Sequence, residues 1–78
     1  MVMLGLIAQK DGDLPEAVRQ YSSAFELQHT DVRALLLAQA LRLEGHVDEA
    51  DAMYQRAARA SRNLTEAQKT ADSLLAGK

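Results

Sequence analysis

Apolar residues recur along most of this chain at intervals of three and four positions, which places them on one face of an α-helix. No stretch shows a convincing two-residue alternation of the kind that is typical of a half-buried strand. Turn-forming residues interrupt the helical pattern between the segments. We therefore predict an all-α protein whose five helices cover about residues 2–10, 14–28, 31–44, 47–60 and 64–76.

Two of the predicted helices begin with a capping signal. Asp13 precedes the second helix and Asn63 precedes the fifth, and each is followed three positions later by a glutamate, Glu16 or Glu66. A short polar side chain at the N-cap accepts a hydrogen bond from the first turn, and the glutamate completes a capping box. The only proline, Pro15, falls in a first turn, where a missing N–H costs little.

The connections between the predicted helices are short, so we expect consecutive helices to run antiparallel. Gly12 follows the first helix and Gly45 follows the third. We expect both glycines to adopt the left-handed conformation that commonly ends a helix and that disfavours residues with a Cβ atom.

The chain repeats its own pattern at an interval of 33 residues. The stretch GDLPEAVRQYSSA begins at Gly12 and GHVDEADAMYQRA begins at Gly45, and Gly, Glu, Ala, Tyr and Ala occupy the same offsets in both. The alanines lie seven positions apart, so they form a small-residue face on which a second helix packs closely. Tyr21 and Tyr54 are expected to fill the remaining volume. The same shift relates the third predicted helix to the fifth, which therefore corresponds to the first half of a third unit.

Several residues recur in register in the two units. They are Leu4, Gly5, Gly12, Ala17, Tyr21 and Ala24 in the first, and Leu37, Ala38, Gly45, Ala50, Tyr54 and Ala57 in the second. A helix pair of this length with small residues at fixed offsets resembles the tetratricopeptide repeat (TPR). The resemblance implies a right-handed α-solenoid of antiparallel helix hairpins. This solenoid is expected to form one domain over residues 1–78, with units at about 1–29 and 31–62 and a C-terminal capping helix at about 63–76.

The two ends of the chain differ in polarity. The first helix is apolar on nearly every side, so one partner helix cannot cover it, and either an upstream unit or a second copy of the chain is expected to pack there. The self-association face predicted on this helix consists of Val2, Met3, Leu6 and Ile7. The last helix has a polar face, which suits a C-terminal cap. We therefore expect a C-terminal fragment of a longer repeat protein.

Composition and charge exclude several classes of function. The net charge of −2 and the pI of about 5.5 provide no attraction for phosphate backbones, so nucleic-acid binding is not expected. No apolar run reaches the ~20 residues that span a bilayer, and the apolar N-terminal stretch lacks the flanks of a signal peptide. We expect a soluble protein without membrane insertion, and the sequence leaves its compartment open.

The sequence offers no catalytic or metal-binding constellation. It has no cysteine, and its two histidines, His29 and His46, lie in turns that a helix separates by about 20 Å. Acidic residues gather in first helical turns, where they offset the helix dipole. We therefore predict no metal, no cofactor and no enzymatic activity.

What remains is a binding surface. In the TPR family the first helix of each unit lines a concave groove that holds a peptide or a partner helix. Carried onto this chain, the groove residues are Leu6, Gln9, Lys10, Leu35, Gln39, Arg42, Gln68, Asp72 and Leu75. The leading hypothesis is a non-catalytic protein–protein interaction module. The alternative is a structural end-piece of a longer solenoid that self-associates through its apolar N-terminal helix.

Overall fold

The computed structural model describes residues 2–76 and contains five helices in this part of the chain. They are α1 (Val2–Lys10), α2 (Leu14–Leu27), α3 (Asp31–Leu43), α4 (Val47–Ala60) and α5 (Leu64–Leu75). The described residues form no strand, so the predicted all-α class is confirmed. Each observed helix end lies within one residue of its predicted position.

The predicted N-caps of α2 and α5 are confirmed. The side chain of Asp13 accepts a hydrogen bond from the backbone N–H of Glu16 at 3.2 Å, and Asn63 caps α5 in the same way. The carboxylate of Glu16 accepts hydrogen bonds from the side chains of Arg19 and Gln20 on the following turn. These bonds direct the Glu16 carboxylate along α2, and the Asp13 N–H donates to the Ala8 carbonyl instead, so the predicted capping box is not completed at α2.

The two predicted left-handed glycines are also confirmed. Gly12 has a φ of +81° and Gly45 a φ of +92°. The same pair of hydrogen bonds closes both turns. After α1, Asp13 N–H donates to the Ala8 carbonyl at 2.8 Å and Gly12 N–H to the Gln9 carbonyl at 3.1 Å. The bonds after α3 lie 33 positions further on and measure 2.9 and 3.0 Å. This Schellman motif satisfies carbonyls that the helix end would otherwise leave free.

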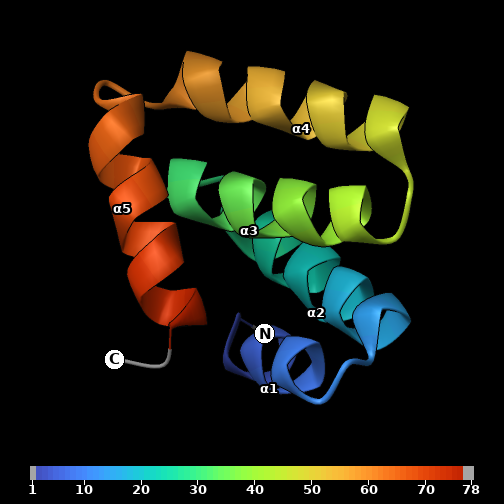
Figure 1. Ribbon diagram of the computed structural model, residues 1–78. Coiled ribbons are helices and arrows are strands. Elements are labelled where there is room, and N and C mark those ends of the chain that lie inside the picture. The colour runs from blue at the N-terminus through green and yellow to red at the C-terminus, as the bar shows by residue number, and fades with distance from the viewer. Residues whose placement is uncertain (1, 77–78) are drawn as a thin grey trace.

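Helix α3 lies at the centre of the molecule (Figure 1). It packs against α2, α4 and α5, while α1 packs against α2. Because it has neighbours on three sides, α3 buries apolar side chains around most of its circumference. These buried residues are Ala34, Leu35, Leu36, Leu37, Ala38, Ala40 and Leu41.

The packing is not identical in the two predicted units. Tyr21 is buried with 1% of its surface exposed, whereas Tyr54 is only partly buried. A Cβ atom on Gly5 would lie 2.5 Å from two carbons of the Tyr21 ring, so this ring occupies the space of a missing side chain. Ala38 holds the equivalent position in the second unit, so the glycine that accommodates the Tyr21 ring is not repeated there.

The last helix also departs from a strict repeat. In a strict 33-residue repeat, α5 would pack against α4 in the way that α3 packs against α2. Instead, α5 packs chiefly against α3. Ala67 and Ala71 are the buried residues of α5, and their small side chains permit this close approach. The C-terminal end of α5 consequently points towards α1 at the lower side of the molecule in Figure 1.

Candidate binding cleft

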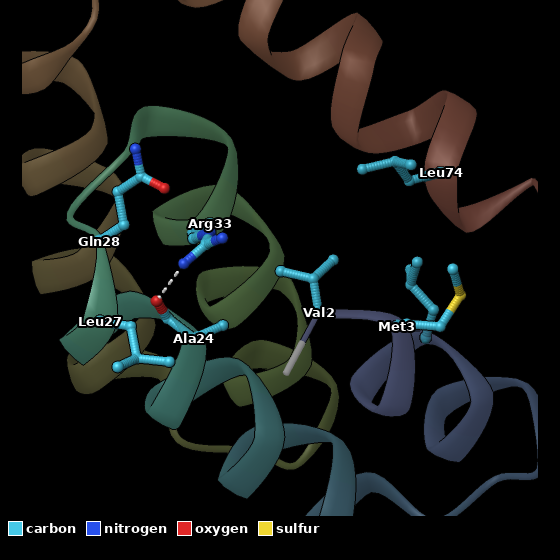
Figure 2. A pocket seen from close by; sticks show the side chains of 8 residues that line it. Val2, Met3, Ala24, Leu27, Gln28, Arg33 and Leu74 are labelled. Atoms are coloured by element: carbon cyan, nitrogen blue, oxygen red, sulfur yellow. Dashed lines mark hydrogen bonds between the residues drawn. The ribbon is translucent and has the colours of Figure 1, made fainter.

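A cleft of about 500 Å³ opens where α1, the end of α2, the start of α3 and the end of α5 converge. Figure 2 shows side chains from these elements around it. The lining residues are Val2, Met3, Leu6, Ala24, Leu27, Gln28, Arg33 and Leu74. Most of them are apolar, and Met3 and Leu27 are 68% and 74% exposed. This cleft, called the binding cleft below, therefore presents a concave apolar surface.

Arg33 contributes the one charged side chain among the described lining residues. Its Nη1 atom donates a hydrogen bond of 2.6 Å to the carbonyl oxygen of Ala24, as Figure 2 shows. Ala24 lies in the last turn of α2, where the helix dipole is negative and favours a nearby cation. The bond holds the half-buried guanidinium at the wall of the binding cleft, next to Gln28.

The predicted self-association face falls largely within this cleft. Val2, Met3 and Leu6 line it. Ile7 is not part of the lining and is 51% exposed on another side of α1. The helix therefore presents apolar side chains on two sides, one facing the binding cleft and one outside it.

The predicted groove residues do not gather in one place. Leu35 is 1% exposed and Leu6 is 9% exposed, so both side chains belong to the core. Leu35 therefore presents almost no surface to a partner, contrary to the groove expected from the resemblance. The side chain of Gln9 is directed towards the same core, because its Oε1 atom accepts a hydrogen bond of 2.8 Å from the hydroxyl of Tyr21.

The polar groove candidates lie away from the binding cleft. Lys10 and Arg42 are exposed near the C-terminal ends of α1 and α3, and neither lines the cleft. On α5, the side-chain amide of Gln68 donates to the carboxylate of Asp72 at 2.9 Å. The remaining two candidates, Gln39 and Leu75, are partly buried.

Five lining residues were not identified from the sequence: Ala24, Leu27, Gln28, Arg33 and Leu74. They come from three different helices and one turn, and they meet only because α5 leans across α3 towards α1. The sequence carries no local signal for Leu27, because a single leucine at a helix end occurs both in cores and on surfaces.

The described lining of the binding cleft is mostly apolar. Its described lining contains no carboxylate, histidine or hydroxyl that could act as a base or a nucleophile. Residues 2–76 hold no group of three metal-ligating side chains, and no helix within them has the length and hydrophobicity to cross a membrane. Comparisons of the chain with protein-family models, curated proteins and solved structures give no match.

Proposed function

We propose that this protein is a non-catalytic interaction module that receives a segment of another protein in the binding cleft. The observation that carries the proposal is the concave apolar lining with Met3 and Leu27 largely exposed. Apolar surface that stays in contact with water at a concave site favours association with a complementary partner. A charged residue at such a site contributes specificity more than affinity.

The proposed partner segment is an amphipathic helix or an extended peptide with an acidic residue. Its apolar side chains would pack on Met3, Leu27 and Leu74. Its carboxylate would face Arg33, whose planar guanidinium has further N–H donors beyond the one bound to Ala24. This recognition mode places apolar anchors in a groove and uses one ion pair to fix the register.

We further propose that the helix pairs α1–α2 and α3–α4 form a short right-handed α-solenoid of the TPR type, with α5 as its cap. The support is the pair of Schellman turns at Gly12 and Gly45, which repeat with the same hydrogen bonds 33 residues apart. In this arrangement Gln39, Arg42 and the polar residues of α5 would extend the partner surface beyond the binding cleft.

A peptide-display selection tests the proposed function. Random helical peptides are selected on the intact chain and then measured against Leu27→Glu, which adds a negative charge to the binding cleft at a highly exposed position. We expect the selected peptides to be apolar and acidic and to bind the variant at least about tenfold more weakly. The matched control is Leu43→Glu, a leucine that is 61% exposed at the end of α3 and outside the lining. The proposal would be refuted if both variants lost the same peptide affinity, or if the selected peptides bound Leu27→Glu as tightly as the parent chain.

A second candidate function, self-association, is favoured by the outer side of α1. Leu4 and Ile7 are 50% and 51% exposed, lie nearly one turn apart on α1 and do not line the binding cleft, so they form a separate apolar strip. Light scattering across a concentration series distinguishes the two functions. Ile7→Glu should abolish a dimer that forms through this strip and leave peptide binding at Leu27 unchanged, while a chain that is monomeric at all concentrations would exclude self-association.

A further inference from the structure

A second, smaller cleft of about 280 Å³ lies between the C-terminal ends of α2 and α4. Its lining residues are Phe25, His29, Arg56, Arg59 and Ala60, none of which lines the binding cleft. Every ionisable side chain among them is basic. This basic cleft is notable in a chain whose net charge is −2.

Two ring contacts position side chains in the basic cleft. The rings of Phe25 and His29 stack with their centroids 4.4 Å apart and an angle of 11° between their planes. The Cζ atom of Arg56 lies 6.0 Å from the centroid of the Phe25 ring, within the range of a cation–π contact. Phe25 is only 6% exposed, so it forms a fixed base from which the exposed His29 and Arg56 side chains extend.

The two arginines have no acidic partner within residues 2–76. Ion pairs form elsewhere in this part of the chain, between Arg19 and Glu16 and between Lys69 and Glu66. Arg59 lies in the last turn of α4, where a cation stabilises the helix dipole. That effect does not account for Arg56, which lies nearly one turn earlier on the same helix and faces the same cleft.

We propose that the basic cleft binds a phosphate dianion. Guanidinium groups match the oxygens of a phosphate in bidentate geometry, and Arg56 and Arg59 supply the two positive charges that such a dianion requires. The imidazole of His29 adds an N–H donor at the rim. The volume suits one small group, and the acidic balance of the whole chain disfavours an extended polyanion such as a nucleic acid.

The source of the phosphate is either inorganic phosphate or an aryl phosphate of the phosphotyrosine type. An aryl phosphate would gain from its ring, which can lie against the exposed His29 imidazole of the Phe25–His29 stack. Inorganic phosphate has no ring and would gain nothing from this stack. Titration with phosphate and with phenyl phosphate therefore separates the two sources by the ratio of their affinities.

The experiment is an NMR titration of the intact chain at constant ionic strength. We expect saturable shifts of the amide signals of His29, Arg59 and Ala60 with phenyl phosphate. Arg59→Gln should weaken binding at least about tenfold, because a charge-assisted bidentate pair is lost. The matched control is Arg42→Gln, which removes the same charge from an exposed position outside the basic cleft and should leave the affinity unchanged.

The affinities for phenyl phosphate and inorganic phosphate distinguish the two sources. Tighter binding of phenyl phosphate than of inorganic phosphate supports an aryl phosphate ligand, and equal affinities support binding of phosphate alone. Shifts that do not saturate, that sodium chloride reproduces, or that are equally weakened by Arg59→Gln and Arg42→Gln overturn the proposal. Arg56→Gln provides a second variant, whose circular dichroism spectrum shows whether loss of the contact with Phe25 affects the fold.

Discussion

At the scale of single residues, Gly5 and Tyr21 determine how α1 and α2 pack. The Tyr21 ring lies against the backbone of Gly5 in α1, and the Tyr21 hydroxyl donates a hydrogen bond to Gln9, which also belongs to α1. A large side chain of α2 therefore packs on α1 and leaves no buried polar atom unpaired. Burial also raises the pKa of Tyr21 to about 12, because a charged phenolate would lose its hydration there.

Gly5→Ala should destabilise the protein despite the better helix propensity of alanine. The new methyl group would lie 2.5 Å from the Tyr21 ring, and overpacking of this kind costs about 1–3 kcal/mol. Alanine recovers about 1 kcal/mol in a helix interior, so a net loss of up to about 2 kcal/mol is expected in urea denaturation. In a Tyr21→Leu background the same substitution should cost less, because the ring is absent. A Gly5→Ala variant as stable as the parent chain would contradict this account.

The stability of the protein should decrease at alkaline pH because of Tyr21. Its pKa is raised from 10.0 to about 12, so the unfolded state loses the phenolic proton first. The stabilisation is complete below pH 10 and is lost as the pH rises through 12, approaching about 3 kcal/mol in total.

The control for this pH dependence is Tyr21→Phe, which keeps the ring and removes the ionisable group. The variant should lose about 1 kcal/mol at neutral pH, since the hydrogen bond to Gln9 is absent. It should then lose less free energy of unfolding than the parent chain between pH 10 and 12. Parallel losses in the two proteins would show that Tyr21 is not responsible.

At the scale of helices, local hydrogen bonds define where each element begins and ends. Asp13, Thr30 and Asn63 each accept a hydrogen bond from the first turn of the following helix, with donor–acceptor distances of 3.2 Å. His46 occupies the N-cap of α4, but its side chain makes no capping bond. Helix α4 instead carries Asp48 and Glu49 in its first turn, where they stabilise the positive end of the dipole.

Asp13→Ala should reduce the free energy of unfolding by about 1 kcal/mol, the usual cost of removing an N-cap side chain. His46→Ala is the matched control, because it changes the same position of another helix without removing a capping bond. Its effect should stay within about 0.5 kcal/mol. Thermal unfolding followed by circular dichroism measures both variants. Equal destabilisation would indicate that the Asp13 cap adds nothing.

At the scale of the whole molecule, α3 connects the parts of the fold. It packs on α2, α4 and α5, while α1 is attached through α2 (Figure 1). Helix α1 keeps an exposed apolar side. The two clefts lie at the periphery of this arrangement, where helix ends from different parts of the sequence meet. A stable centre with helix ends around it is a common basis for binding sites, because the centre fixes their positions.

Hydrogen exchange should therefore be slowest in α3. Its amides are shielded by three neighbouring helices, so their exchange requires the largest opening of the structure. Amides of α1 should exchange faster, because this helix has only nine residues and packs mainly on α2. Native-state exchange followed by NMR measures each amide separately. If α1 were protected as strongly as α3, the central role assigned to α3 would be wrong.

The sequence by itself determined the five helices and most of their ends. The signals at Asp13, Gly12, Gly45 and Asn63 act through hydrogen bonds that span at most five residues, so no distant contact is needed to form them. Helix formation and capping are local, and they can be predicted from a local pattern.

Only the tertiary structure decided which side chains remain exposed and where they meet. Leu35 lies in the core and Arg33 lines the binding cleft, although both belong to the same apolar helix. Tyr21 and Tyr54 occupy equivalent positions of the repeat, yet Tyr21 is buried against Gly5 and Tyr54 is only partly buried. The angle at which helices cross depends on the side-chain volumes of both partners at their contact. The clefts depend on those angles, so a pattern along one chain segment does not determine them.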